Sequence, residues 1–160
     1  MFLFMLFSTL FPSIFTDLEK QHWICNSSDL SVWYTYCDKM KHSISIKLEP
    51  CLTLKGGRGY LQLSYIPRRD IKKLYFNIYM YLKTIEFPMR TEVVCRGFDD
   101  QYSFCRAVKG ETVNTTIPFS FNEIHFSKGQ YRIVTEAIAG SPEEMLFCLN
   151  FTAIHTSKLK

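Results

Sequence analysis

The segment from Leu74 to Leu82 reads Leu-Tyr-Phe-Asn-Ile-Tyr-Met-Tyr-Leu. Every second residue is a large apolar side chain, and the residues between them are three tyrosines and one asparagine. Successive side chains of an extended strand point to opposite faces, so this period of two predicts a strand with one face in a core. It is the longest such alternation in the chain.

Shorter alternations of the same kind lie on both sides of this segment, at residues 44–48, 61–63, 117–121, 131–135 and 145–151. Pro50, the glycines at 56, 57 and 59, and Lys128-Gly129 supply turns between them. No segment shows a sustained helical period, so the chain is predicted to be an all-β antiparallel sandwich or barrel. A chain of 160 residues can form one domain with its own core, which we place at residues 17–160.

The last alternation also makes a prediction about an asparagine. Met145 and the three alternate residues that follow it are expected on the inner face of a strand, and Asn150 on the outer face. Asn150 begins a glycosylation sequon, as do Asn26 and Asn114. Three sequons favour a secretory route, with glycans expected at all three asparagines.

The N-terminal residues 1–16 carry no charged side chain and are mostly apolar. This stretch is too short to span a bilayer, is interrupted by Pro12, and is followed at once by Asp17 and Glu19. It therefore predicts a secretory signal peptide rather than a membrane anchor, and the mature protein is expected outside the cell.

Six cysteines follow the signal peptide, namely Cys25, Cys37, Cys51, Cys95, Cys105 and Cys148. An oxidising compartment would pair them, and six cysteines allow 15 pairings. Their short separation favours a disulfide between Cys95 and Cys105, whereas the spacing leaves the other two pairs open. The spacings match no zinc-binding template.

The chain lacks the motifs of common enzymes. His22, His42, His125 and His155 are scattered, with no acidic or cysteine partner at ligand spacing. No nucleophile elbow, phosphate-binding glycine loop or HExxH motif occurs. We therefore predict a protein that is not an enzyme, with no catalytic residues, no cofactor and no metal site. The net charge of +4 is too small to indicate nucleic acid, but it is compatible with an anionic lipid or an acidic protein surface.

Two features suggest a lipid ligand. The expected inner faces are rich in long or aromatic residues such as Phe76 and Phe147, and cations such as Arg90 and Arg132 lie near apolar turn residues. A rim of cations around an apolar mouth would suit a molecule with acyl tails and a phosphorylated head. An ordinary packed core with a solvated surface accounts for the same residues, so the pattern alone leaves both readings open.

Four stretches carry a resemblance to a known family. The longest runs from Gly97 to Thr116 and reads Gly-Phe-Asp-Asp-Gln-Tyr-Ser-Phe-Cys-Arg-Ala-Val-Lys-Gly-Glu-Thr-Val-Asn-Thr-Thr. The others are Tyr65-Ile-Pro-Arg-Arg-Asp, Lys73-Leu-Tyr-Phe-Asn and Gly140-Ser-Pro-Glu-Glu-Met-Leu-Phe-Cys-Leu. They closely resemble the ML lipid-recognition family, in its branch of lipopolysaccharide co-receptors, and the likeness continues from the signal peptide to about Ile154.

The resemblance implies an immunoglobulin-like β-sandwich of two antiparallel sheets with a deep apolar cavity between them, the ML domain. It implies the disulfides Cys25–Cys51, Cys37–Cys148 and Cys95–Cys105. It also implies a secreted co-receptor that binds the lipid A part of bacterial lipopolysaccharide and presents it to the ectodomain of Toll-like receptor four. Receptor dimerisation and innate immune inflammatory signalling would follow. The protein would meet the cell surface and membrane only through the receptor, and no nucleic acid would be involved.

The resemblance also assigns residues to the site. The acyl cavity would be lined by Ile44, Ile46, Leu48, Leu52, Leu61, Phe76, Ile78, Phe104, Ile117, Phe119, Phe121, Tyr131, Ile133, Phe147 and Phe151. Cations on the phosphate side would be Arg58, Arg90, Arg96, Lys128 and Arg132. The receptor would contact Arg68, Asp70, Asp99, Asp100, Tyr102, Ser103, Arg106 and Lys109.

A lipid with more tail volume than the cavity accepts would expose its excess chain. We expect this chain to emerge near Ile85, Phe87, Ile124 and Phe126, where it would form an apolar patch that recruits a second receptor copy. Two other functions stay open on the sequence: a soluble carrier of sterol or glycolipid with the same fold, and an adhesion module with a solid core and no ligand.

Overall fold

The computed structural model describes residues 20–37, 43–53, 57–121 and 127–156. These residues form short and long β-strands joined by turns, with one 3-10 turn, η1. The elements in chain order are β1 (His22–Asn26), β2 (Leu30–Tyr36), β3 (Ser45–Glu49), β4 (Gly57–Tyr65), β5 (Leu74–Leu82), β6 (Ile85–Glu86), β7 (Arg90–Cys95), η1 (Ser103–Arg106), β8 (Val113–Phe121), β9 (Gly129–Ala139) and β10 (Glu144–His155).

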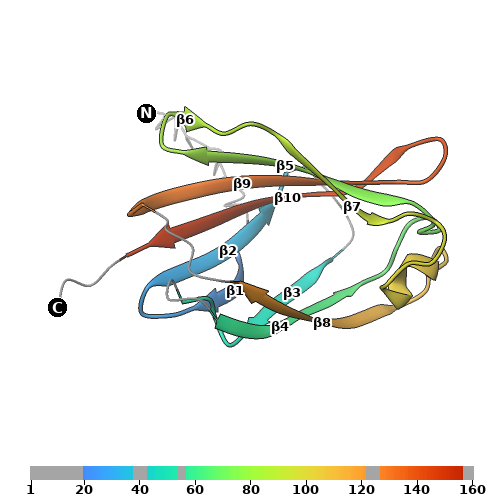
Figure 1. The fold of residues 1–160 in the computed structure, drawn as a ribbon, viewed down its shortest axis with the longest axis horizontal. Coiled ribbons are helices and arrows are strands. Elements are labelled where there is room, and N and C mark those ends of the chain that lie inside the picture. Colours follow the sequence, from blue (N-terminus) through green and yellow to red (C-terminus); the bar gives the residue numbers. More distant parts are fainter. Residues whose placement is uncertain (1–19, 38–42, 54–56, 122–126, 157–160) are drawn as a thin grey trace, which may run out of the picture.

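The strands form two antiparallel sheets that lie over one another as layers (Figure 1). The larger sheet has the order β1-β2-β10-β9-β5-β6, and β7 also pairs with β5. The smaller sheet has the order β3-β4-β8. The prediction of an all-β fold with two antiparallel sheets is therefore confirmed.

The alternation from Leu74 to Leu82 forms β5, as predicted. In its pairing with β9, Phe76 lies opposite Ala137 and Met80 lies opposite Ile133. Directly opposed residues of an antiparallel pair project to the same face, so the apolar residues of β5 and β9 share the inner face of the larger sheet. None of the described inner-face residues of β5 and β9 is Asp, Glu, Lys or Arg.

A tightly packed core lies where β4 ends and β5 begins. Ile71 is fully buried there, and Leu74 is 3% exposed. The turn η1 buries Phe104 in the same cluster, and the Ile71 amide donates a hydrogen bond of 2.8 Å to the Ala107 carbonyl. These contacts close one end of the sandwich.

One detail of the sequence prediction is wrong. Met145 was expected on the inner face, but a β-bulge between Met145 and Phe147 shifts the register of β10 against β9. Met145 therefore lies opposite Ile138 and is 43% exposed, while Leu146 is buried. A bulge inserts one extra residue into a strand, which reverses the faces on its two sides.

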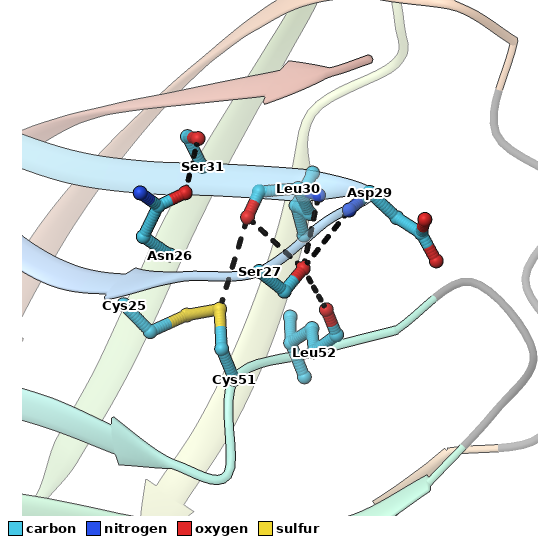
Figure 2. Close-up of a disulfide and its surroundings, with 8 residues drawn as sticks. All are labelled: Cys25, Asn26, Ser27, Asp29, Leu30, Ser31, Cys51 and Leu52. Atoms are coloured by element: carbon cyan, nitrogen blue, oxygen red, sulfur yellow. Dashed lines mark hydrogen bonds between the residues drawn. A yellow bond between two sulfur atoms is a disulfide. The ribbon is translucent and has the colours of Figure 1, made fainter. Parts of the chain in front are cut away.

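The six cysteines form three disulfides, Cys25–Cys51, Cys37–Cys148 and Cys95–Cys105. These are the pairs that the resemblance implies. Cys25 lies in β1 of the larger sheet and Cys51 follows β3 of the smaller sheet, so this bridge joins the two layers (Figure 2). Beside it the Ser27 hydroxyl lies 3.0 Å from the Leu52 carbonyl, a second link between the same segments.

Candidate functional site

Along β4 and β5, the inner-face apolar residues are buried at one end of the strand and half-buried toward the other. In β4, Tyr65 is buried, whereas Leu63 and Leu61 are only half-buried. In β5, Leu74 is buried and the inner residues after it, up to Leu82, are half-buried. We call the end at Tyr65 and Leu74 the closed end and the end at Leu61 and Leu82 the open end. Apolar surface that is directed inward but left uncovered by protein is the feature expected of a site for hydrocarbon.

The smaller sheet contributes a row of aliphatic side chains near its open end. Leu61 of β4 lies opposite Leu48 of β3 on one side and opposite Ile117 of β8 on the other. All three are half-buried. Pairing in register places them side by side on one face, so together they form a continuous apolar strip across the sheet.

The larger sheet carries a matching row. Met80 lies opposite Ile133, which lies opposite Phe151, which in turn lies opposite Tyr34. The rings of Phe151 and Tyr34 are 5.9 Å apart between centroids. Phe151 from this sheet and Ile117 from the smaller one pack against the same buried cluster, so the two rows face a common interior.

Two phenols belong to the buried cluster. Tyr34 is 2% exposed and donates a hydrogen bond to the Ile44 carbonyl. Burial, together with the neighbouring Tyr36, raises the pKa of Tyr34 to about 12, and burial raises the pKa of Tyr65 to about 12. Both hydroxyls therefore stay neutral at physiological pH and add no charge to the interior.

The structure gathers most of the predicted cavity residues on the two inner faces. Those that lie in register on β3, β4 and β8 are Ile46, Leu48, Leu61 and Ile117. Those on β5, β9 and β10 are Phe76, Ile78, Tyr131, Ile133, Phe147 and Phe151. Phe119 and Phe121 lie in β8 opposite Gly59 and Gly57.

Several predicted lining residues differ from the half-buried rows. Ile44, Phe104 and Phe147 are buried in the cluster at the closed end, and Tyr131 is buried opposite Leu82. Leu52 follows Cys51 outside the strands. The prediction omitted Leu63 and Met80, although both belong to the same inner rows. Their even spacing from Leu61 and Ile78 could have identified them.

The five predicted rim cations are exposed but do not form one cluster. Arg90 begins β7, an edge strand, and lies opposite Ile78, which places it on the inner side of the larger sheet. Arg132 lies opposite Tyr81 on the outer face, where its guanidinium stacks 5.6 Å from the Tyr81 ring centroid. Arg96 follows Cys95, which pairs with Leu74 at the start of β5, whereas Arg132 pairs with Tyr81 near the end of β5. These two cations therefore lie near opposite ends of the strand.

The other two cations lie at strand ends. Arg58 alternates with Gly57 and Gly59 in β4 and so lies on the outer face of the smaller sheet. Lys128 directly precedes β9 and is exposed. Of the five cations, Arg90 is the one that strand pairing places on the inner side of a sheet.

The predicted receptor contacts come together at the closed end. The Lys109 amide donates a hydrogen bond of 3.0 Å to the Asp70 carboxylate, which joins the segment after β4 to the segment after η1. The Asp100 carboxylate accepts hydrogen bonds from the Arg96 and Gly97 amides, so it fixes the loop that the Cys95–Cys105 disulfide closes. The remaining predicted contacts flank these groups, namely Arg68, Asp99, Tyr102, Ser103 and Arg106.

Two residues of the predicted dimerisation rim are exposed apolar side chains. Ile85 is 57% exposed and Phe87 is 39% exposed. Ile124 and Phe126 lie outside the described residues, as do residues 1–16 of the predicted signal peptide.

The sequon asparagines lie on outward positions. Asn150 lies on the outer face of β10, as the alternation predicts, and its side-chain oxygen accepts a hydrogen bond from the Arg132 Nε. Asn114 is exposed on β8, opposite Ser64 on the outer face of the smaller sheet. Asn26 ends β1 and is exposed.

The described part of the chain contains no set of three His, Cys, Asp or Glu side chains placed to hold a metal ion. Within the same residues, no helix has the length and apolar character needed to cross a membrane.

This sequence matches curated proteins over nearly its whole length. It is 64% identical to human lymphocyte antigen 96 over 152 residues, which are 95% of each chain. It is 64% identical to lymphocyte antigen 96 of Bos taurus over 159 residues, which are 99% of each chain. No protein-family model matches the sequence. The matched proteins are lymphocyte antigens and not enzymes, which confirms the prediction of a non-enzymatic protein.

Two solved structures have the same fold. Chicken MD-1 complexed with lipid IVa superposes with a TM-score of 0.70 at 19% identity, over 86% of this chain and 99% of that one. A Niemann-Pick type C2 protein from Japanese carpenter ant superposes with a TM-score of 0.54 at 17% identity, over 74% of this chain and 96% of that one. The predicted ML fold is therefore confirmed.

Proposed function

Because this chain belongs to the lymphocyte antigen 96 family, we propose that it is a secreted co-receptor for bacterial lipopolysaccharide. It binds the lipid A part between its two sheets and presents it to the ectodomain of Toll-like receptor four, which leads to innate immune inflammatory signalling. The observation that carries this proposal is the pair of facing apolar rows, Leu48–Leu61–Ile117 and Met80–Ile133–Phe151, which remain half-buried at the open end.

The ligand class has independent support. Chicken MD-1, which has the same fold, was solved with lipid IVa, a lipid ligand. The inner faces of β4, β5, β8 and β9 carry no acidic or basic side chain among the described residues, so they suit acyl chains rather than a polar head.

A comparison of binding free energies indicates which part of the lipid contributes most to its affinity. An acyl chain that buries on the order of ten methylenes gains roughly 8 kcal/mol before association and ordering costs. A cation beside an anionic headgroup contributes only about 1 kcal/mol. The apolar rows therefore supply most of the affinity, and a cation at the edge of the inner face, such as Arg90, orients the phosphorylated head.

The receptor would bind at the opposite end. Asp70, Asp100 and Lys109 are fixed by backbone hydrogen bonds at the closed end, where the packed core makes the surface rigid. A rigid charged surface away from the lipid lets one molecule hold ligand and receptor at the same time.

Mass spectrometry under native conditions tests lipid binding directly. The secreted wild-type protein, exposed to lipopolysaccharide, should retain acyl-bearing adducts and capture the receptor ectodomain in a pull-down. Leu61→Glu places a charge on the inner face and should abolish retention, whereas Gln62→Glu changes the next, exposed residue of the same strand and should retain lipid. Equal retention by both variants would contradict the proposal, and sterol adducts alone would favour the carrier function instead.

The proposed rim makes a separate prediction about signalling. Phe87→Ala and Phe126→Ala should each leave lipid retention near the wild-type level and reduce receptor dimerisation, because these side chains would extend the patch formed by excess acyl chain. Cross-linking of receptor ectodomains in the presence of lipopolysaccharide measures the effect. An equal loss of lipid retention and dimerisation would show that the residues belong to the lipid site itself.

A further inference from the structure

A second pocket lies at the closed end, away from the apolar rows. It has a volume of about 540 Å³ and is lined by Arg69, Asp70, Lys72, Lys73, Lys109, Gly140 and Ser141. Its lining residues are all charged or small, and none of them is an aliphatic or aromatic residue. We call it the basic pocket.

Hydrogen bonds hold the walls of the basic pocket in place. The Gly110 amide donates to the Pro67 carbonyl at 2.9 Å, and the Gly140 amide donates to the Lys73 carbonyl at 3.1 Å. Together with the bond from the Lys109 amide to Asp70, they join the three chain segments that form the pocket. The backbone is therefore already ordered before a ligand binds, which lowers the entropic cost of binding.

The charge of the basic pocket is strongly unbalanced. Four of its lining side chains are cations and one, Asp70, is an acid. The Arg69 guanidinium forms a 2.6 Å ion pair with Glu144. Lys72, Lys73 and Lys109 are exposed, and no carboxylate of the described chain lies within ion-pair distance of them. Three ammonium groups without an ion pair, against the single carboxylate of Asp70, attract a group with several negative charges.

The residue types narrow the class of ligand. Protein interfaces are depleted of lysine and rely on aromatic or apolar anchors, which the basic pocket lacks. Lysine acts as a mobile point charge that suits sulfate or phosphate groups without fixed geometry. We propose that the basic pocket binds the sulfate groups of an extracellular sulfated glycan chain. Asp70 and Lys109 are also predicted receptor contacts, so the bound glycan would compete with the receptor but not with lipid.

Calorimetric titration with a heparin-derived octasaccharide tests this inference on the full secreted protein. Lys72→Gln/Lys73→Gln should weaken binding at least about tenfold and reduce the slope of log affinity against log salt by about two, because each phosphate-type contact contributes about one. Lys20→Gln/Lys47→Gln removes the same charge from exposed positions elsewhere and should weaken binding less than about threefold. Lys72→Arg/Lys73→Arg keeps the charge and should bind like the wild type.

Each competing explanation has its own outcome. Equal weakening by the two glutamine variants would overturn the proposal in favour of general attraction to a basic protein, and so would loss of binding in the arginine variant. Polyglutamate that binds as tightly as the octasaccharide would assign the pocket to an acidic protein. Displacement of the octasaccharide by lipid A would assign it to a lipid headgroup. Retention of lipid A by Lys72→Gln/Lys73→Gln is measured in parallel and tests the lipid function separately.

Discussion

At the residue scale, the two buried phenols of Tyr34 and Tyr65 make stability depend on alkaline pH. The pKa of each is raised to about 12, whereas an unfolded tyrosine ionises near 10.0. The unfolded state therefore loses these protons first as pH rises. Their contribution to stability is complete below about pH 10 and is lost progressively up to about pH 12.

Urea unfolding at a series of pH values measures this dependence. Tyr65→Phe should flatten the fall in unfolding free energy above about pH 10, because phenylalanine has no proton to lose. Tyr60→Phe changes a side chain that is 57% exposed and should leave the curve unchanged. A Tyr65→Phe protein with the wild-type slope would show that the Tyr65 phenol does not carry the effect.

Gly140 supports a second prediction at this scale. Its φ is +87°, and a Cβ there would lie 2.6 Å from the Arg69 guanidinium. Gly140→Ala should cost about 1–2 kcal/mol for the left-handed backbone, as should Gly110→Ala, whose φ is +82° with open space around it. Arg69 is flexible and can move aside from the added Cβ, which would break its ion pair with Glu144. This loss should raise the cost of Gly140→Ala by less than about 1 kcal/mol above that of Gly110→Ala.

Urea midpoints of the two alanine variants decide whether the Arg69 contact matters. Gly57→Ala serves as the control, because this glycine has an ordinary backbone and no atom within 4 Å of the added Cβ, and it should be near neutral. Gly110→Ala as stable as Gly57→Ala would show that the left-handed backbone costs less than stated.

At the element scale, the inner rows should divide into positions that support folding and positions that support binding. Leu149 of β10 is 1% exposed and belongs to the buried cluster, so Leu149→Ala should cost about 2–5 kcal/mol of stability. Leu61 of β4 is half-buried, so Leu61→Ala should cost less than about 1.5 kcal/mol while it weakens lipid retention. Chemical unfolding measures the stability of both variants, and native mass spectrometry measures their lipid retention. A larger loss of stability in Leu61→Ala than in Leu149→Ala would contradict this division.

The strands themselves were largely predictable, because side-chain alternation is a local property. It identified β5 in full, and it placed Asn150 on the outer face. It failed for Met145 because the bulge in β10 depends on the pairing with β9, which no local pattern encodes. The alternation of Arg132 with Tyr131 and Ile133 also indicated that Arg132 faces outward. The prediction assigned it to the phosphate rim instead, because it lies near apolar turn residues in the sequence.

At the scale of the whole molecule, two of the disulfides should have distinct effects. Cys25–Cys51 closes a separation of 26 residues and joins the two sheets, so Cys25→Ser/Cys51→Ser should cost about 3–4 kcal/mol and also weaken lipid retention. Cys95–Cys105 closes a separation of 10 residues within the predicted receptor loop. Cys95→Ser/Cys105→Ser should cost about 2–3 kcal/mol and reduce receptor capture while lipid retention persists.

Urea unfolding, lipid retention and receptor pull-down on the same two variants test this assignment. If both variants lost lipid and receptor in equal measure, the disulfides would act only through overall stability. The wild-type protein under mild reduction is a further control, since it should lose all functions together.

The difference in burial between the two ends of β5 was beyond local sequence patterns. Leu74 and Leu82 belong to the same alternation, yet one is buried and the other half-buried. The difference depends on which distant segments cover them, so periodicity alone fits a filled sandwich and an open one equally. The same limit applies to the disulfides: a separation of 10 residues indicated Cys95–Cys105, while separations of 26 and 111 gave no local signal.

The outward positions of Asn114 and Asn150 have a consequence for immune recognition of the protein itself. One asparagine lies on the outer face of each sheet, so attached sugars would shield both broad sides of the molecule. The side-chain oxygen of Asn150 already accepts the Arg132 hydrogen bond, which leaves the amide nitrogen available for the glycan. Antibodies raised against the glycosylated protein should then recognise epitopes at its two ends, and such antibodies would block ligand or receptor.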